Sequence, residues 1–334
     1  MSQLILAVPS KGRLEENATD IFARAGMPLK RAGARGYQGH VTGIDTIDVL
    51  YLSASEIAAR LADGSIHFGI TGEDLLREEI PDLDSAVQLV QKLGFGQADV
   101  VVALPDGWVD VTRMADFAEV ASEFRAAHGR RLRVATKYTH LTAEFFARHD
   151  VVDYVLVQSF GATEGAPASG AAEAIVDITS TGATLAANNL RIPDDGLILK
   201  SEANLAAALK ANWSAPARNS ARMLLARLHA YLGAGKMKQV TFFTGGIGVS
   251  ARPRLSIAEY EDVGHRFGAQ QIASSPQHNM STGSDTFLVP DKNLTEMIEA
   301  WMQIGGYEKA VVTTPDFYFE KRNPLFERLA GAIL

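Results

Sequence analysis

Hydroxyl side chains and one glycine cluster where a predicted strand passes into a predicted helix. The apolar run 174–178 carries one acid, Asp177, and a helix-forming run begins at Leu185. Backbone N–H groups and the positive end of a helix attract an anion at such a junction, and hydroxyls add donors. The loop therefore predicts a phosphate site, with Asp177 suited to the hydroxyls of an attached sugar. Its residues are Thr179, Ser180, Thr181, Gly182, Ala183 and Thr184.

Two other interpretations apply to this loop taken alone. The P-loop of NTP-hydrolysing proteins is excluded, because the lysine of its G-x-x-x-x-G-K-[ST] pattern is missing. An ordinary helix cap remains open, since serine and threonine are favoured at helix starts. The loop residues by themselves do not separate a helix cap from a phosphate site.

Residues upstream of the loop extend the pattern. Gly170 and Ala172 follow Glu164, and the run from Ile175 to Leu185 completes a pattern of 22 residues. This pattern closely resembles the signature of the ATP phosphoribosyltransferases, the enzymes that open histidine biosynthesis. Four further segments resemble that family in the same order, so the similarity covers residues 1–230. These segments are 7–14, 62–74, 93–96 and 134–138.

The resemblance implies a fold, a reaction and a cofactor. It implies an α/β catalytic part of two lobes, like the type II periplasmic binding proteins, with the active site in the cleft between the lobes. The implied reaction joins N1 of ATP to C1 of phosphoribosyl pyrophosphate and releases pyrophosphate, with Mg²⁺ held mainly through the pyrophosphate. Because pyrophosphate leaves readily, we expect catalysis by alignment and electrostatic stabilisation, and we assign no general base.

The resemblance also implies roles for individual residues. The loop from Thr179 to Thr184 is expected to bind the 5′-phosphate of phosphoribosyl pyrophosphate and Asp177 its ribose hydroxyls, with Glu164 assisting there or near Mg²⁺. Contacts to ATP or pyrophosphate are expected from two turns that each follow a predicted strand. They are Lys11, Gly12 and Arg13 in the first turn, and Thr71, Gly72 and Glu73 in the second.

Elementary electrostatics supports the first turn more than the second. Lys11 and Arg13 at a helix start oppose the helix dipole, which gives a functional reason more weight than solvated surface charges. Thr71 and Asp74 fit a capping box almost as well as a ligand site.

The predicted first lobe departs from the family pattern at two places. Ser53 stands where the family usually has an arginine, and Ala98-Asp99 stands where a Cys-Arg pair is common. Both departures concern the contacts of the first lobe to ATP or pyrophosphate, and the phosphate loop is unaffected.

Short apolar runs alternate with helix-period segments through the first two-thirds of the chain. This alternation predicts crossover units and largely parallel sheets. We expect catalytic lobe I at residues 1–105 plus 196–233 and catalytic lobe II at 106–195. The predicted strands are 4–8, 47–52, 67–71, 99–104, 132–136, 151–157, 174–178 and 196–200, and the predicted helices are 14–25, 56–62, 74–79, 111–127, 141–148 and 214–232.

The pattern changes after a glycine-rich joint at 233–235. The tail predicts the order β-α-β-β-α-β, typical of a ferredoxin-like module, at 236–334. Long-form members of the family carry a C-terminal module where bound histidine inhibits them, and short-form members use a separate partner subunit. Histidine regulation is one hypothesis for this tail, and a purely oligomerising domain is the other. The predicted strands are 239–244, 271–274, 286–289 and 310–314, and the predicted helices are 257–267 and 294–304.

Length and composition limit the possible classes. The 334 residues suit about two domains, and 47% hydrophobic with 21% charged residues is ordinary for a globular protein. The 32 Lys and Arg against 39 Asp and Glu leave a net charge of −7, which gives no electrostatic case for nucleic acid. The absence of cysteine excludes disulfides, thiolate catalysis and Cys-ligated metals.

Other motifs argue against targeting and metal binding. The start of the chain does not read as a secretory signal, and no run approaches the ~18 apolar residues of a membrane helix. We therefore expect a cytoplasmic protein without a membrane partner, and a homo-oligomer. The eight histidines show no H-E-x-x-H spacing. The run 246–251 reads G-x-G-x-x-A, but Pro253 interrupts any following helix, so a dinucleotide site is not predicted.

Three functions compete on these observations. Phosphoribosyl transfer to ATP is the leading hypothesis. A rival of another class is a non-catalytic two-lobed protein that binds or senses small anions. A nearer rival is a phosphoribosyltransferase for another base, but such enzymes commonly have two adjacent acids before the loop, where this chain has only Asp177.

Overall fold

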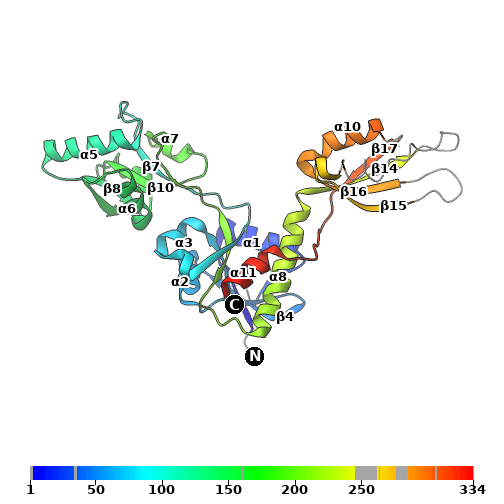
Figure 1. The fold of residues 1–334 in the computed structure, drawn as a ribbon. Coiled ribbons are helices and arrows are strands. Elements are labelled where there is room, and N and C mark those ends of the chain that lie inside the picture. Colours follow the sequence, from blue (N-terminus) through cyan, green and yellow to red (C-terminus); the bar gives the residue numbers. More distant parts are fainter. Residues whose placement is uncertain are drawn as a thin grey trace. The chain divides into compact units, whose positions relative to one another are not determined.

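The chain forms two compact units in the computed structural model, drawn in Figure 1. One unit comprises Met1–Ala221 with Leu325–Leu334, and the other comprises Arg222–Pro324. The structure describes residues 3–33, 36–159, 161–244, 262, 264–275, 284–304 and 307–333.

Lobe I of the first unit is built on a seven-stranded sheet. Its strand order is β2-β3-β4-β1-β5-β13-β6, with β1 parallel to both of its neighbours and β13 antiparallel to both of its own. The predicted strands 4–8, 47–52 and 67–71 are confirmed as β1, β4 and β5. The strands are β1 (Leu4–Pro9), β2 (Leu29–Arg31), β3 (Gln38–Val41), β4 (Ile44–Leu52), β5 (Phe68–Gly72), β6 (Val87–Lys92) and β13 (Ala203–Ala208).

Four helices pack on this sheet through apolar stripes. Helix α2 begins after Ser53, whose hydroxyl accepts a hydrogen bond from the Glu56 N–H at 3.2 Å. It ends at Gly64, which takes the left-handed conformation that favours glycine. The stripe of α2 buries Ile57 and Leu61 against the sheet. The helices are α1 (Gly12–Arg24), α2 (Ala54–Asp63), α3 (Glu73–Glu79) and α4 (Leu83–Ala86).

Lobe II of the first unit is built on a six-stranded sheet. Its order is β11-β7-β10-β8-β9, and β12 also pairs with β7. The prediction of parallel strands holds for β10, β8 and β9, whereas β7 runs antiparallel to β10. The strands are β7 (Asp99–Pro105), β8 (Leu132–Thr136), β9 (Tyr154–Gln158), β10 (Ala174–Thr179), β11 (Leu190–Arg191) and β12 (Leu197–Leu199). The helices are α5 (Met114–His128), α6 (Thr139–Arg148), η1 (Thr163–Gly165) and α7 (Ala183–Ala187).

The two sheets divide the chain at different places from the predicted lobe boundaries. Strands β7 and β12 fall within the ranges predicted for lobe I, yet both belong to the sheet of lobe II. The chain crosses between the lobes just before β7 and just after β12, where Ala98 N–H donates to the Ser201 carbonyl at 2.9 Å. An apolar run does not reveal which of two sheets it will join, so the sequence pattern could not locate these crossings.

The second unit contains a four-stranded antiparallel sheet. Its order is β15-β16-β14-β17, and its core includes Phe242, Phe287 and Trp301. The predicted helix at 257–267 lies mostly outside the described residues, as does the glycine-containing run 246–251. The other predicted elements of the tail are confirmed. They are β14 (Met237–Thr244), β15 (Gln270–Ser275), β16 (Ser284–Pro290), α10 (Leu294–Ile304) and β17 (Tyr307–Thr313), with the short helix η2 (Asp291–Asn293) before α10.

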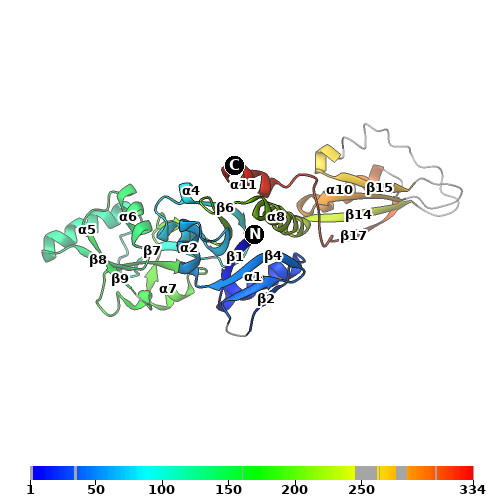
Figure 2. The ribbon, with the colours of Figure 1, turned by 90° about the horizontal axis from the view of Figure 1, so that it is seen from below.

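Two helices connect the units. The predicted helix 214–232 is confirmed as α8 (Ala215–Ala234), which begins in the first unit and continues into the second. The last helix, α11 (Pro324–Ile333), belongs to the first unit, although the sequence analysis assigned all of 236–334 to the tail module. Leu325, Phe326 and Leu329 are buried, and Arg328 Nη2 donates to the Val90 carbonyl of β6 at 3.1 Å. Figure 2 shows α11 beside β6.

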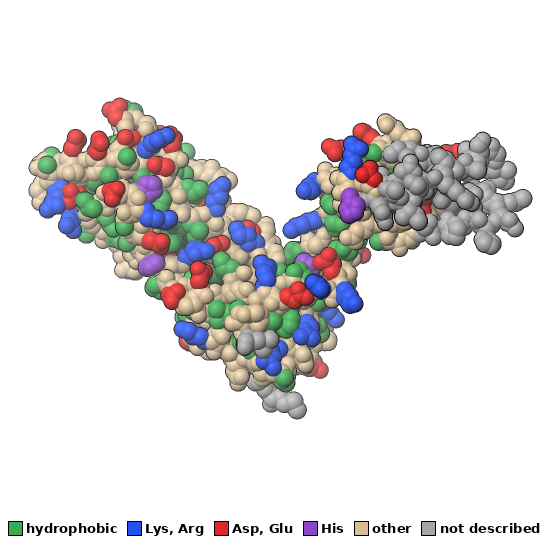
Figure 3. All heavy atoms as spheres, in the orientation of Figure 1, with side chains coloured by type: hydrophobic (Ala, Val, Ile, Leu, Met, Phe, Trp, Pro, Cys, Tyr) green, Lys and Arg blue, Asp and Glu red, His purple; other side chains and the backbone are tan. Residues whose placement is uncertain are grey.

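The surface carries charges of both signs. Figure 3 shows Lys and Arg interspersed with Asp and Glu over the visible face of the described residues. None of the helices in the described part of the chain is both long and apolar enough to span a bilayer.

Glu173 fastens the start of β10 to the neighbouring strand β8. Its Oε1 lies 2.6 Å from Arg133 Nη2 and 3.0 Å from Arg130 Nη2, and its Oε2 accepts the Arg133 backbone N–H at 2.7 Å. Burial by itself would raise the pKa of Glu173, but the hydrogen bonds from the two arginines outweigh it and lower that pKa to about 2. The carboxylate therefore holds the strand that leads into the hydroxyl-rich loop.

This lowered pKa gives a pH-dependent stability. The Glu173 interaction is fully present above the ordinary pKa of 4.5 and is lost as the pH falls from there toward 2. We expect Glu173→Gln to lower the melting temperature at pH 7 by about 2–4 °C, and to flatten the loss of stability over the acid range. Scanning calorimetry at several pH values measures both. Glu123→Gln, on the exposed face of α5, is the control, and equal behaviour of the two variants would refute the assignment.

Candidate active site

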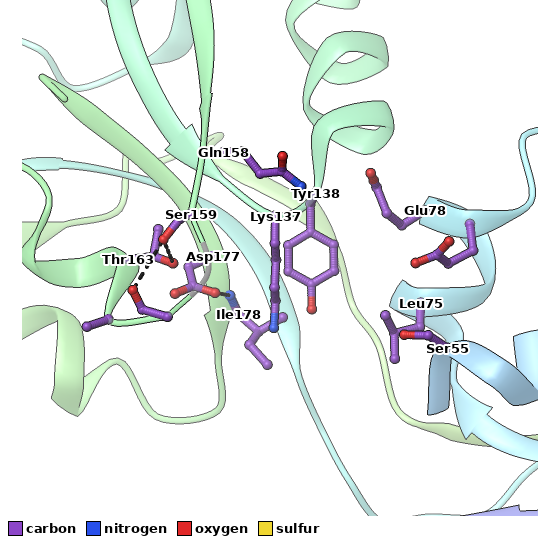
Figure 4. Close-up of a pocket in the computed structure, with 13 residues that line it drawn as sticks. Ser55, Leu75, Glu78, Lys137, Tyr138, Gln158, Ser159, Thr163, Asp177 and Ile178 are labelled. Carbon is purple, nitrogen blue, oxygen red and sulfur yellow. Dashed lines mark hydrogen bonds between the residues drawn. The ribbon is translucent and has the colours of Figure 1, made fainter. Parts of the chain in front are cut away.

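A cavity of 570 Å³ lies between lobe I and lobe II (Figure 4). It is lined where strands of both lobes end and helices begin, the arrangement in which open α/β sheets bind ligands. Lobe I contributes Ser55, Leu75, Glu78 and Glu79. Lobe II contributes Lys137, Tyr138, Gln158, Ser159, Gly161, Ala162, Thr163, Asp177 and Ile178.

The predicted phosphate loop leaves this cavity at Asp177. Strand β10 ends at Thr179, whose Oγ1 accepts the Gly182 N–H at 2.8 Å, and the short helix α7 begins at Ala183. Gly182 has φ +75°, and a Cβ placed there would meet no atom within 4 Å. The loop thus bends over open space, with Ser180 and Thr184 exposed. Backbone donors at the start of a helix beside open space suit an anion.

Asp177 lines the interlobe cavity, whereas Glu164 lies outside its lining, next to the lining residue Thr163. The carboxylate of Asp177 lines the cavity, and its Oδ1 accepts the Ile178 backbone N–H at 2.8 Å. Glu164 lies in η1 beside Thr163, a lining residue whose hydroxyl donates to the Ser159 Oγ at 2.9 Å. Asp177 and the loop 179–184 therefore lie together at the edge of this cavity.

The lysine–glycine–arginine turn lies at the carboxyl end of β1, outside the lining of the cavity. Lys11 and Arg13 are exposed, and Gly12 has φ +75° with open space around it. Neither side chain forms an ion pair with another described residue. The turn is thus accessible to a ligand, although its residues do not line the interlobe cavity.

Sequence reasoning overlooked Arg31, which is anchored beside that turn. Its Nη2 donates to the Ser10 carbonyl at 3.0 Å and pairs with Glu15 at 2.9 Å. Its guanidinium lies 3.9 Å from the ring centroid of Tyr51. Strand β2, which carries Arg31, was not predicted, because three residues are too few for a periodic signal.

The second predicted turn is occupied by internal contacts. Glu73 is buried and pairs with Arg77 at 2.8 Å, and Thr71 is completely buried. Gly72 forms the N-terminal end of α3, with Asp74 Oδ1 only 2.2 Å from where a Cβ of residue 72 would stand. These residues therefore do not line the interlobe cavity. The predicted capping box is not formed either, because the N-cap of α3 is Gly72 and the buried Thr71 hydroxyl has no hydrogen-bond partner among the described residues.

The carboxylate of the next residue, Asp74, instead joins the two lobes. Its Oδ2 accepts the Tyr138 hydroxyl at 2.7 Å and its Oδ1 accepts the Ser201 hydroxyl at 2.8 Å. All three residues are buried, Tyr138 to 1% exposure. Burial and the nearby Asp74 charge both raise the pKa of Tyr138, which keeps its hydroxyl protonated as a donor. We call these three residues the interlobe clamp.

Glu78 makes a second connection between the lobes. Its carboxylate accepts the His140 and Leu141 backbone N–H groups at 2.9 and 3.0 Å, and the Thr139 hydroxyl at 3.1 Å. A carboxylate is favourable at a helix N-terminus because it meets unsatisfied N–H groups and the positive end of the helix dipole. Glu78 of lobe I thus caps α6 of lobe II, and this carboxylate is not free for chemistry.

Lys137 is the basic residue among the described residues that line the cavity. It follows β8 and extends into the cavity in Figure 4, with its Nζ 5.0 Å from the Tyr138 ring centroid. The position at the carboxyl end of a predicted parallel strand was a usable signal, but the sequence analysis assigned Lys137 no role. Ser53, where the family usually has an arginine, caps α2, so lobe I offers no cation to the cavity there.

The His, Asp and Glu side chains of the described residues are not clustered as metal ligands. Among them, no group of three or more His, Cys, Asp or Glu side chains is arranged to hold a metal ion.

Comparisons with known proteins agree on one family. The family model "HisG: ATP phosphoribosyltransferase" matches residues 53–230. An ATP phosphoribosyltransferase of Rhodopseudomonas palustris (strain BisA53) is 50% identical over 332 residues, covering 98% of each chain. One from Bradyrhizobium sp. (strain ORS 278) is 49% identical over 328 residues, covering 98% of this chain and 97% of its own.

A solved structure shares the fold. The structure titled "ATP phosphoribosyl transferase (HisG:HisZ) complex from Thermotoga maritima" matches with a TM-score of 0.51 and 23% identity. The match covers 68% of this chain and 97% of that chain.

The interlobe clamp makes a testable contribution to stability. We expect Tyr138→Phe to lower the free energy of unfolding by roughly 1.5–3 kcal/mol, because it removes a buried hydrogen bond to a charged group. In the Asp74→Asn background, Tyr138→Phe should lower the free energy of unfolding by much less, since the two residues share that hydrogen bond. Urea unfolding of the four proteins measures the coupling. Tyr154→Phe, a partly buried tyrosine of the same lobe, is the control, and additive effects of Asp74→Asn and Tyr138→Phe would contradict the clamp.

Proposed function

The chain belongs to the ATP phosphoribosyltransferase family, and from this membership we propose how its residues perform the transfer of the first step of histidine biosynthesis. The reaction condenses ATP with phosphoribosyl pyrophosphate and releases pyrophosphate. The observation that carries the assignment to this site is the position of Asp177, which lines the interlobe cavity directly before the open loop 179–184.

We place phosphoribosyl pyrophosphate on lobe II. The backbone N–H groups around Gly182 and the hydroxyls of Ser180 and Thr181 would hold the 5′-phosphate. Asp177 would accept hydrogen bonds from the ribose hydroxyls, with Glu164 nearby. This arrangement is supported by the open space over Gly182 and by the exposure of the loop hydroxyls.

The pyrophosphate group and ATP would then occupy the side of the cleft that faces lobe I. Lys137 extends into the cavity and would stabilise the negative charge that develops on departing pyrophosphate. Lys11, Gly12 and Arg13 would contact the ATP phosphates when the ligand reaches the edge of the lobe I sheet. We assign the second turn, with Thr71, Gly72 and Glu73, a supporting role, because its residues do not line the interlobe cavity and Glu73 is paired with Arg77.

The residues present fit a Mg²⁺ ion that is bound mainly by substrate. Mg²⁺ with phosphates commonly takes one or two carboxylates from the protein, and Asp177 and Glu164 are the carboxylates beside the loop. When bound, the ion would neutralise charge on the pyrophosphate. The protein residues themselves would orient the ribose.

We propose that the catalytic part is two-lobed as in type II periplasmic binding proteins.

For the second unit, we propose a ferredoxin-like module with a regulatory or oligomerising role in a homo-oligomer. The sheet order β15-β16-β14-β17, antiparallel throughout, supports the ferredoxin-like assignment. Because the Thermotoga relative is titled as a complex of two protein types, a separate regulatory subunit is the alternative to histidine binding on the module. The use of ATP as a substrate by this chain supports a cytoplasmic location for it.

The activity is tested by mixing the full chain with ATP, phosphoribosyl pyrophosphate and Mg²⁺. We expect pyrophosphate release together with an ultraviolet-absorbing adduct of ATP.

Gly182→Ala should raise the KM for phosphoribosyl pyrophosphate roughly tenfold, because the added strain of a side chain at positive φ tilts the loop donors. Asp177→Asn should lower kcat/KM for it roughly ten- to hundredfold.

Gly129→Ala is the matched control for the loop variant. Gly129 ends α5 with φ +68° and has equally open surroundings, so this variant carries the same strain away from the cleft. Product with another base but not with ATP would contradict the assignment of ATP as the substrate. Ligand binding without turnover would favour the non-catalytic sensor. Equal KM values for the two glycine variants would remove the phosphate role of the loop.

Histidine regulation has its own measurement. If the module binds histidine, hydrogen–deuterium exchange of the full chain should slow in peptides of 237–313 when histidine is added, and activity should fall in parallel. The full chain is required, because a cut at residue 233 would also remove α11 from the first unit. Unchanged exchange in the module with unchanged activity would leave the oligomerising role.

A further inference from the structure

A second cavity, of 440 Å³, lies on lobe I and is lined by none of the residues of the interlobe cavity. It is formed by edge strand β6, by β13 and the crossing segment before it, and by α11. Helix α11 contributes Arg328 to its lining, although about a hundred residues of the second unit separate α11 from the rest of the first unit in the sequence. The polar lining residues are Glu73, Gln91, Lys92, Lys200, Asn204 and Arg328.

The charges of this cavity do not cancel. Glu73 is the acidic residue of the lining, and it is already paired with Arg77 at 2.8 Å. Lys92, which is exposed, pairs with the half-buried Glu202 at 3.4 Å. Lys200 and Arg328 have no acidic partner among the described residues. The cavity therefore presents uncompensated positive charge.

The cationic groups are held by contacts that leave donors available. Arg328 Nη2 donates to the Val90 carbonyl at 3.1 Å, which orients the guanidinium while its other N–H groups stay open. The buried neighbours Leu325 and Leu329 hold the helix turn that carries it. Asn204, 1% exposed, uses its Nδ2 to reach the Glu202 carbonyl at 3.1 Å, and an amide nitrogen carries a second hydrogen.

We propose that this cavity is a second anion site, which binds a small phosphate monoester. A planar arginine fork with lysine point charges is the usual protein partner of a phosphate group. The volume exceeds that of a phosphate alone, and Leu89 and Val90 line the remaining space, which suits a short organic body on the phosphate.

The site lies directly beside the interlobe clamp. Lys200 precedes Ser201 and Glu73 precedes Asp74, the two residues joined by the 2.8 Å hydrogen bond of the clamp. A ligand that contacts Lys200 thus touches the segment where the chain crosses between the lobes. The site does not depend on the roles proposed for the cleft.

Lysine footprinting tests the site on the full chain. The protein is acylated with and without inorganic phosphate, or glycerol 3-phosphate, at ionic strength matched with sodium chloride, and each lysine is quantified by mass spectrometry. We expect both probes to reduce labelling of Lys200 and Lys92, with glycerol 3-phosphate effective at lower concentration, while exposed Lys30 and Lys210 are unchanged. Because each lysine is read separately, binding in the cleft registers at Lys137 and is not confused with this site.

Arg328→Gln supplies the decisive variant. In this variant we expect that roughly ten to a hundred times more probe is needed to reduce the labelling of Lys200 by the same amount, since a charge-assisted contact is lost. Arg328→Lys should restore part of the protection, and Arg322→Gln, an exposed arginine of the second unit, should change nothing. Equal labelling of Lys200 in phosphate and in sodium chloride would overturn the proposal. Full protection in Arg328→Gln, with α11 retained by hydrogen exchange, would overturn it as well.

Discussion

A buried carboxylate joins the two lobes of the catalytic part at the crossing between them. Asp74 belongs to lobe I, and it accepts hydrogen bonds from Tyr138 of lobe II and from Ser201 in the crossing segment. A charge in such a buried position is costly unless its acceptor sites are filled, and here both oxygens are filled. The stable arrangement of this carboxylate is therefore one in which the lobes are together, and the interlobe cavity depends on it.

The cleft shows how a chain of negative net charge can be suited to two polyanionic substrates. The groups in and beside it that can attract an anion are local, namely Lys137 and the helix start after Gly182, and the surface as a whole does not supply them. Two acidic side chains of lobe I are engaged in structural contacts, since Glu78 caps α6 and Glu73 pairs with Arg77. Asp177 of lobe II and the exposed Glu79 of lobe I are the lining carboxylates that remain to face a ligand.

The tail is connected to the catalytic part at both of its ends. The chain enters it along α8 and returns through α11, whose apolar side is buried on lobe I. The α11 anchor also lies at the edge strand β6, next to the crossing segments that join the lobes.

The sequence by itself determined the features that depend on local pattern. The apolar runs of β1, β4, β5 and β10, the amphipathic helices and the 22-residue pattern ending at Leu185 could all be read directly, and the family followed from them. Strand β13 could not, because ANLAAA has the composition of a helix, and only its position between β5 and β6 makes it a buried strand. The clamp, the cap on α6, the sheet to which β7 belongs and the return of α11 were likewise decided by tertiary structure. Each joins residues far apart in the chain, and such contacts form only when burial and hydrogen bonding are satisfied together in three dimensions.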